Sequence, residues 1–377
     1  MHSNSSRKII FLLSQNDIGG HTKFVLNLSK ELKGRGFEVE IYVPFFTHFY
    51  YTLKFRRKND FTDVNMWARY FLGQLRAMLF ESKFKWRGNS LGFERFPVRR
   101  YLFLPKKKFL ENSDFIISSA HWDLELLLKF GLNSSAIIHV IHHLHSNNRS
   151  DLEIFRETRN FTLIVSSEAT GKQCMNYGIN NFDICKLGVD INMFNPKHRV
   201  RDDLSKINVG FFYYDHPRKN PRFIEEIVKK TVENDSNICV TIFGNSFRNF
   251  SERIEVVEGL TEIDYARKIA NLDLFVYISK IEGFGLPPLE AMASGVPVIS
   301  SDVGAIRNYI KNNYNGLIIN DSIAVEELYS LILSTLNDDN SNLKFRKNGL
   351  TTSKEWSWSK TCDSYIKVFE KVRIGCK

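Results

Sequence analysis

Two carboxylates, Glu282 and Glu290, end a segment rich in glycine and proline, Glu-Gly-Phe-Gly-Leu-Pro-Pro-Leu-Glu. An apolar run over residues 272–279 predicts a buried strand before it, and the downstream residues predict a helix with Pro287 or Pro288 at its first position. In this order of strand, glycine turn and helix, the free N–H groups and the positive dipole end of the helix face the carboxyl end of the strand. The segment therefore favours an anion such as a phosphate, and its carboxylates suit the hydroxyl groups of a sugar or ribose.

The apolar runs elsewhere predict two α/β domains that would position this turn. Residues 8–13 and 39–43 flank a Gly19-Gly20 turn and a helix-period segment, which is a Rossmann-like βαβ unit. Further short strands are expected at residues 114–119, 136–141, 163–167, 207–212, 238–244, 254–257, 274–279 and 296–300. Strands that alternate with helical stretches predict parallel sheets. Two such domains with a linker near residues 190–206 are expected to bind a ligand in a cleft between the facing carboxyl edges of their sheets.

The first glycine turn does not match the dinucleotide-binding fingerprint. The sequence Asp-Ile-Gly-Gly-His at residues 17–21 lacks Gly-x-Gly-x-x-Gly, and the second strand ends in Val43-Pro44 without an acid for the ribose. A dehydrogenase is therefore disfavoured.

The composition is that of a folded protein with a basic excess. The chain has 377 residues, 43% of them hydrophobic, and a formal charge of +10, which favours polyanionic partners or anionic membrane surfaces. Much of the excess lies at residues 52–110, where basic residues alternate with Phe, Tyr and Trp, a mixture that fits a membrane interface. A solvated basic face with aromatic residues in the core is the alternative. Nucleic acid is not expected as a partner because no recognised nucleic-acid motif accompanies the charge.

The cysteines and the N-terminal residues point to a cytoplasmic protein. The five cysteines are scattered and contain no Cys-x-x-Cys pair, so we expect free thiols and neither a disulfide framework nor a zinc site. The first apolar run, residues 9–13, is too short for a signal peptide or a membrane span.

Several motifs together resemble the family-4 retaining glycosyltransferases, or group 1 glycosyl transferases, which have the GT-B fold. Residues 282–290 reproduce the Glu-x7-Glu motif of that family, and residues 290–304 continue it. The sequence Leu-Gly-Val-Asp at 187–190 resembles the Asn-Gly-Val-Asp linker of the family, and residues 215–220 resemble its phosphate segment. The similarity covers most of the chain except about residues 46–110.

The resemblance implies roles for individual residues. Glu282, His142 and Lys219 would be the catalytic residues: Glu282 would hold hydroxyls of the transferred sugar, Lys219 would neutralise the donor diphosphate, and His142 would lie near the anomeric carbon. His143 and His145 are alternatives for this histidine. The donor-binding residues implied are Gly19, Gly20, Arg218, Lys219, Gly283, Phe284, Gly285, Leu286 and Glu290, with Glu290 on the ribose. No metal and no cofactor are expected beside the nucleotide sugar, which is a co-substrate.

Two positions depart from the family pattern. Tyr213 stands where the family commonly has an Arg, so a cation is missing near the expected diphosphate, and Leu187 replaces the usual Asn. Arg218 has a planar fork that suits phosphate and would compensate for the missing charge.

The resemblance implies an enzyme that moves a hexosyl or deoxyhexosyl group to a glycan or lipid-linked acceptor of a bacterial-type surface polysaccharide such as lipopolysaccharide. The departing phosphate would take the proton of the acceptor, so the two glutamates are not assigned as the acid and nucleophile of a glycosidase. A non-catalytic nucleotide-binding protein and a sugar-nucleotide epimerase of the same architecture are the alternatives.

The expected domain limits are residues 1–190 for an acceptor domain with an insertion at about 46–110, 191–355 for a donor domain, and 356–377 for a helix that crosses back to the first domain. The protein is expected in the cytoplasm or peripherally on the inner membrane face.

Overall fold

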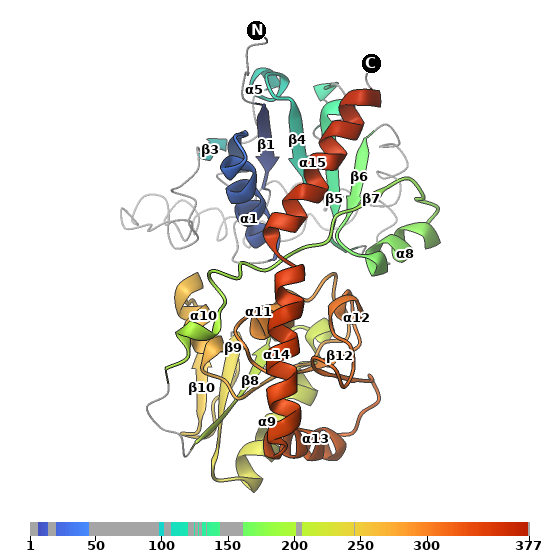
Figure 1. The fold of residues 1–377 in the computed structure, drawn as a ribbon. Coiled ribbons are helices and arrows are strands. Elements are labelled where there is room, and N and C mark those ends of the chain that lie inside the picture. Colours follow the sequence, from blue (N-terminus) through green and yellow to red (C-terminus); the bar gives the residue numbers. More distant parts are fainter. Residues whose placement is uncertain are drawn as a thin grey trace, which may run out of the picture. The chain divides into compact units, whose positions relative to one another are not determined.

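The computed structural model describes residues 7–13, 20–44, 98–101, 107–119, 124, 127, 130–132, 134–143, 161–200, 206–244 and 246–375 (Figure 1). Most of the basic and aromatic segment, together with Gly19 and His145, lies outside these residues, so the expectations placed on it stay predictions. The chain divides into two compact units, Met1–His139 with Glu157–Thr162 and Val140–Arg156 with Leu163–Lys377. The domain limits expected from the sequence stay predictions as well.

The chain begins with the predicted βαβ unit. Strand β1 (Lys8–Leu12) is followed by helix α1 (Gly20–Gly34) and strand β2 (Glu38–Pro44), and the two strands pair in parallel. The helix buries Phe24, Leu28 and Leu32, and the ring of Phe24 meets Phe11 of β1 edge to face with centroids 6.3 Å apart. The apolar period of the helix thus covers a strand with four fully buried positions.

A seven-stranded sheet has the order β3-β2-β1-β4-β5-β6-β7. The remaining strands and short helices that belong to it are β3 (Val98–Tyr101), α5 (Lys107–Glu111), β4 (Phe115–Ser118), β5 (Ile137–Ile141), β6 (Thr162–Val165), α8 (Glu168–Asn176) and β7 (Asp183–Ile184). The strand pairs β1 with β2, β1 with β4, β2 with β3, β4 with β5 and β6 with β7 are parallel. The prediction of a parallel sheet is confirmed.

A six-stranded parallel sheet follows in the order β10-β9-β8-β11-β12-β13. Its strands are β8 (Ile207–Tyr213), β9 (Ile238–Gly244), β10 (Ile254–Val257), β11 (Leu274–Tyr277), β12 (Val298–Ser301) and β13 (Leu317–Ile319). Its helices are α9 (Pro221–Asn234), α10 (Glu262–Ala270), α11 (Leu286–Ala293), α12 (Ile306–Tyr309), α13 (Val325–Asn337), α14 (Asp339–Glu355) and α15 (Trp358–Gly375).

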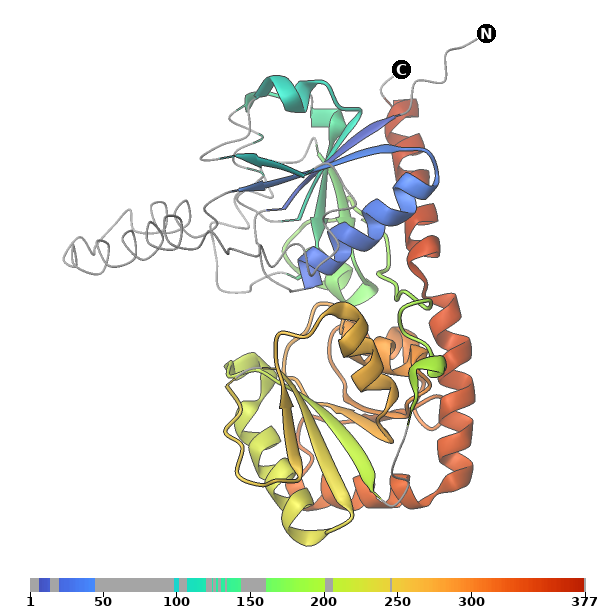
Figure 2. The ribbon, with the colours of Figure 1, turned by 90° about the vertical axis from the view of Figure 1, so that its left-hand side faces the viewer.

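Helices cover both faces of this second sheet (Figure 2). The side chains of strand residues such as Phe211 and Val276 pack in one hydrophobic core with helix residues. These include Ile224 and Ile227 of α9 and Leu328 of α13. Because the central strands are covered on both faces, their residues are almost all apolar, which explains why short apolar runs marked them in the sequence.

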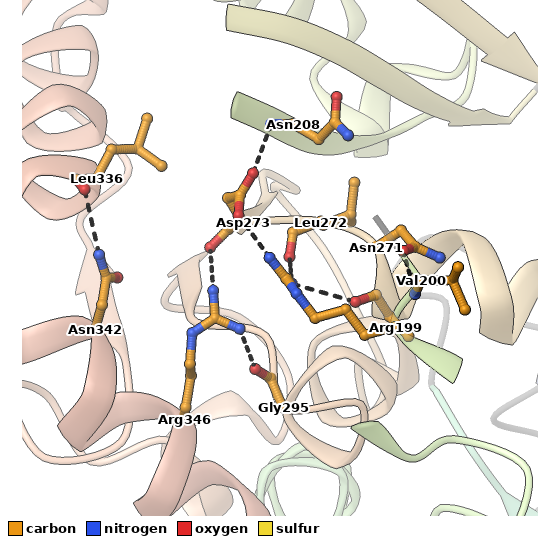
Figure 3. Close-up of polar contacts among 11 residues, drawn as sticks. Arg199, Val200, Asn208, Asn271, Leu272, Asp273, Gly295, Leu336, Asn342 and Arg346 are labelled. Carbon is orange, nitrogen blue, oxygen red and sulfur yellow. Dashed lines mark hydrogen bonds and ion pairs between the residues drawn. The ribbon is translucent and has the colours of Figure 1, made fainter. Parts of the chain in front are cut away.

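A polar cluster holds the amino ends of β8 and β11 together (Figure 3). Asp273 accepts a hydrogen bond from the backbone N–H of Asn208 at 2.8 Å and forms an ion pair with Arg199 at 2.8 Å. Arg346 of α14 donates to the backbone carbonyl oxygen of Gly295 at 2.7 Å and to that of Asp273 at 3.4 Å. These contacts fix the register of the two strands whose opposite ends carry the site described below.

The junction of α14 and α15 lies against residues 186–189. The N–H of Val189 donates to the carbonyl oxygen of Trp356 at 2.8 Å, and Thr361 of α15 donates to the carbonyl oxygen of Lys186 at 2.9 Å. A Cβ on Gly188 would lie 2.4 Å from the carbonyl carbon of Ser357, so this position requires glycine. Within the described residues, no helix is both long enough and apolar enough to span a membrane.

Candidate functional site

Lys219, Glu282 and Tyr277 meet at the carboxyl ends of β8 and β11. The two strands are parallel neighbours, so the segments that follow them lie at one edge of the sheet. The ammonium group of Lys219 pairs with Oε1 of Glu282, and the hydroxyl of Tyr277 donates to the same oxygen at 2.6 Å. The Lys219 and Glu282 side chains are 24% and 12% exposed, so the cluster is partly screened from water yet reachable.

The backbone of Arg218 ties these two segments together. Its carbonyl oxygen accepts hydrogen bonds from the hydroxyl of Ser279 at 3.0 Å, from the N–H of Lys280 at 2.8 Å and from the N–H of Ile281 at 3.3 Å. Three donors on one carbonyl oxygen fix the short turn Pro217–Lys219 against the residues just before Glu282. The position of Lys219 is therefore set by backbone contacts and not by its ion pair alone. The Arg218 side chain is half-buried and forms no ion pair with any other described residue.

Two aromatic rings lie within cation–π distance of the Lys219 ammonium group. Its Nζ lies 5.7 Å from the ring centroid of Phe212 and 5.9 Å from that of Tyr277. Cation–π attraction at these distances favours the ammonium group at the edge of the sheet.

Helix α11 presents its amino end beside this cluster. Gly285 has a φ of 86°, in the left-handed region that favours glycine, and the helix begins at Leu286. The expectation that Pro287 or Pro288 occupies the first helical position is wrong, because the prolines stand second and third. Since proline has no N–H, the free donors of the first turn are the N–H groups of Gly285 and Leu286. These are the two donors that the resemblance implies for a sugar or phosphate.

The hydroxyl of Tyr309 holds this turn in place by donating a hydrogen bond to the carbonyl oxygen of Gly285. Phe284 stacks on the ring of Tyr309 with centroids 5.8 Å apart and packs against Trp356 at 5.9 Å. The side chain of Phe284 is buried in this aromatic cluster, so it anchors the turn, and a ligand would meet only its backbone.

Glu290 lies one turn further along α11 and is buried. Burial raises the pKa of Tyr265 well above its usual value, and the neighbouring Glu290 carboxylate raises it further. The tyrosine therefore keeps its proton beside the carboxylate. Tyr265 belongs to α10, and Phe194 and Phe243 pack edge-on against its ring at 5.9 Å and 5.4 Å.

Two glycines allow backbones to approach closely around Glu282. A Cβ on Gly304, whose φ is 57°, would lie 2.9 Å from the carbonyl oxygens of both Glu282 and Gly283. Within the unit that holds both residues, a Cβ on Gly283 would lie 2.3 Å from the carbonyl oxygen of His142. His142 follows β5 directly and is half-buried, as is His143.

Tyr213 does not take part in the cluster. It is 2% exposed, its ring meets Phe247 edge to face at 5.0 Å, and its hydroxyl donates to Glu225 of α9 at 2.6 Å. Burial and the hydrogen bond to Glu225 raise its pKa. At the position where the family commonly has an Arg, Tyr213 thus faces the α9 core, and its neighbour Phe212 faces Lys219.

Gly20 is the first residue of α1 in the unit that contains β1, where a Cβ would meet nothing within 4 Å. Of the other predicted residues, the structure brings together Arg218, Lys219 and residues 282–290. Sequence reasoning missed Tyr277, Tyr309 and Tyr265. Only Tyr277 carried a local signal, since it ends the strand that leads into the glycine turn.

Comparisons with known proteins give glycosyltransferases as the similar proteins. Residues 214–352 match the family model described as glycosyl transferases group 1. The MMP alpha-(1->4)-mannosyltransferase of Mycolicibacterium hassiacum is 25% identical over 55% of this chain and 53% of its own length. The lipopolysaccharide core biosynthesis mannosyltransferase LpsB of Rhizobium meliloti is 38% identical over 27% of this chain and 29% of its own length. The chain thus spans about a third to a half of these two relatives.

Two solved structures have a similar fold. HepE of Anabaena, in complex with UDP and glucose, has a TM-score of 0.71 at 14% identity and covers 97% of this chain and 100% of its own. The sucrose-phosphate synthase of Thermosynechococcus elongatus has a TM-score of 0.70 at 15% identity and covers 98% of this chain and 100% of its own. At such identities the likeness shows the fold alone, and it confirms the predicted GT-B class.

Proposed function

We propose that the chain is a group 1 glycosyltransferase, whose family model matches residues 214–352, and that it transfers a hexosyl or deoxyhexosyl group from a nucleotide-sugar donor to a glycan or lipid-linked acceptor. The observation that carries the proposal is the meeting of a cation, a carboxylate and two free N–H groups at one sheet edge. Lys219 supplies the cation, Glu282 the carboxylate, and Gly285 and Leu286 the N–H groups.

The arrangement suits the charges that develop during glycosyl transfer. The bond between the anomeric carbon and the diphosphate oxygen breaks, negative charge grows on the leaving nucleoside diphosphate, and the sugar gains oxocarbenium character. Lys219, the guanidinium of Arg218 and the amino end of α11 stabilise the leaving diphosphate. Glu282 accepts hydrogen bonds from sugar hydroxyls, and Glu290 holds the ribose.

We propose retention of the anomeric configuration, by attack of the acceptor hydroxyl on the face from which the phosphate departs. The departing phosphate oxygen takes the proton of that hydroxyl, so the protein supplies no nucleophile and no metal. His142, whose carbonyl oxygen lies beside Gly283, would stand near the anomeric carbon.

The relatives suggest the kind of donor and product. One similar structure holds UDP-glucose, and similar proteins are named as mannosyltransferases of the lipopolysaccharide core and of an O-antigen chain. This favours a nucleotide hexose as donor and a surface polysaccharide as product. If the acceptor is lipid-linked, the protein acts in the cytoplasm at the inner membrane face, with residues 52–110 as the proposed membrane contact.

The test is release of nucleoside diphosphate from a panel of UDP- and GDP-linked hexoses, with and without extracted lipid-linked glycans. We expect wild-type turnover with one member and a loss of about 100-fold or more in kcat/KM for Glu282→Ala and for Lys219→Ala, since each removes a charged contact to the transition state. Lys230→Ala is the matched control, because Lys230 also pairs with a glutamate and lies 5.5 Å from an aromatic ring centroid, that of Tyr329, yet belongs to α9. Unchanged turnover in both site variants would contradict the assignment of the site.

A further inference from the structure

The hydroxyl of Tyr277 is aimed at the carboxylate that the proposed function assigns to the sugar. Tyr277 is 1% exposed and ends β11, five residues before Glu282. Its Oη lies 2.6 Å from Oε1 of Glu282, the oxygen that also pairs with Lys219. Two donors thus converge on one oxygen of the carboxylate.

This convergence leaves the second oxygen for another partner. Among the described residues no hydrogen bond to Oε2 of Glu282 is present, and the side chain is 12% exposed. A carboxylate with one oxygen held from the protein side can rotate little, so Oε2 keeps a fixed direction toward whatever lies above the sheet edge.

The ion pair alone would not preserve this direction during binding. A diphosphate also attracts the Lys219 ammonium group, and when this group turns toward it, Oε1 of Glu282 loses one of its two donors. Tyr277 remains as the second donor to Oε1, because its ring is fixed in the core. Its ring centroid lies 6.0 Å from that of Phe212 and 6.3 Å from that of Phe275.

Packing does not account for the hydroxyl. The neighbouring Phe212 and Phe275 show that an aromatic ring without a polar group fits these two strands. A buried hydroxyl costs free energy unless it forms a hydrogen bond, and here its acceptor is Glu282. Burial and the Glu282 charge also raise the pKa of Tyr277 well above its usual value, so the group stays a donor.

We propose that Tyr277 is a positioning residue, which orients the carboxylate of Glu282 toward a hydroxyl of the transferred sugar while Lys219 moves its charge to the diphosphate. This inference rests on the proposed function and adds a residue to it. It assigns Tyr277 a role in sugar recognition that is separate from nucleotide binding.

The test compares Tyr277→Phe with Tyr213→Phe. The second variant is a matched control, since Tyr213 is also buried and donates at 2.6 Å to a glutamate, but that glutamate is Glu225 of α9. The probes are UDP and UDP-glucose, or GDP and GDP-mannose if wild-type protein turns over the latter pair, with affinity from calorimetry and turnover from nucleoside diphosphate release.

We expect Tyr277→Phe to bind the free nucleoside diphosphate with unchanged affinity and to lose about 10- to 100-fold in kcat/KM with the nucleotide sugar, the range of a hydrogen bond to a charged group. Tyr213→Phe is expected to keep the wild-type affinity for the nucleoside diphosphate and the wild-type kcat/KM. In a Glu282→Gln background, Tyr277→Phe should lower kcat/KM by a further factor of less than about 3, because the two side chains act as one unit. Roughly additive effects of the two substitutions would mean that the side chains have separate roles.

Each other result has a distinct meaning. Equal kcat/KM in Tyr277→Phe and wild type would overturn the role of Tyr277 while leaving the proposed function intact. A parallel loss of nucleotide affinity, or the same loss in Tyr213→Phe, would show that Tyr277 is only structural. A wild-type protein that binds and cleaves no member of the panel would overturn the proposed function and the role of Tyr277 with it.

Discussion

The side chains of Lys219 and Glu282, which are 63 positions apart in the chain, form an ion pair at the edge of the six-stranded sheet. In the proposed reaction both charges are needed for different parts of one ligand. The cation and the carboxylate are paired with each other in the structure, so in the proposed reaction the donor must either separate the two groups or bind both.

The ion pair predicts an asymmetry between single and double variants. Lys219→Met or Glu282→Gln alone leaves the partner group partly buried without its counter-ion, so each should lower the free energy of unfolding by about 1 to 3 kcal/mol. The double variant should recover part of this loss without recovering turnover. Urea denaturation measures the effect, and single variants as stable as the wild type would contradict it.

Gly304 predicts a substitution that acts on the site without touching a ligand. Gly304→Ala brings a Cβ to 2.9 Å from the carbonyl oxygens of Glu282 and Gly283. Gly259→Ala is the control, since Gly259 has a similar φ of 66° and nothing within 4 Å of such a Cβ. Both variants should lose about 1 to 2 kcal/mol of stability from the left-handed backbone. Only Gly304→Ala should also lower kcat/KM, and equal kinetics in the two would count against the close packing.

The buried tyrosines predict a loss of stability at alkaline pH. Burial and the charge of Glu282 raise the pKa of both Tyr277 and Tyr309. In the unfolded chain a tyrosine loses its proton near pH ~10, whereas the native chain keeps these protons to higher pH. The native state then binds more protons, so the free energy of unfolding falls as the pH rises above about 10.

Urea denaturation across the pH range from about 8 to 11 measures this slope. The double variant Tyr277→Phe with Tyr309→Phe should flatten it, whereas Tyr314→Phe should not, since Tyr314 is exposed. A slope that is the same in all three proteins would argue against burial of the two hydroxyls.

Two cysteines are expected to be inert while the chain is folded. Burial raises the pKa of the Cys174 and Cys185 thiols to about 12, and Asp183 adds to the effect at Cys185. At pH ~8 few thiolates exist at these positions, so alkylation should be at least 10-fold slower than in urea. Peptide mapping after iodoacetamide treatment measures it, with the half-buried Cys239 as internal reference. Equally fast labelling of Cys174 and Cys239 would be the contrary result.

The sequence predicted the inner strands of both sheets because their signal is local, whereas the edge strands β3, β7 and β13 were not predicted. A buried parallel strand needs an apolar residue at almost every position, so runs such as residues 9–13 and 274–279 stood out without knowledge of their partners. Glycine turns and helix periods between the runs then predicted parallel order. The start of α11 was misplaced by one or two residues because proline is compatible with several positions of a first turn.

The contacts within the site were beyond the reach of such reasoning. The ion pair of Lys219 with Glu282 depends on how two loops meet, and the alternation of β8 decides that Phe212, not Tyr213, faces them. The alternation of side chains along a strand divides its residues into two sets, one for each face of the sheet. Which set lies near the site depends on how helices cover the two faces, and the sequence of the strand does not show this. The roles of Tyr277 and Tyr309 follow from the same long-range packing.

Trp356 joins parts of the chain that sequence order keeps far apart. Its ring packs against Phe284 and Tyr309 beside the glycine turn, and the ammonium group of Lys186 lies 5.0 Å from its centroid. The indole of Trp356 thus lies between the turn at residues 283–286 and a positive charge. Because the ring contacts Phe284, we expect a shift of residues 283–286 to change the surroundings of Trp356 and with them its fluorescence.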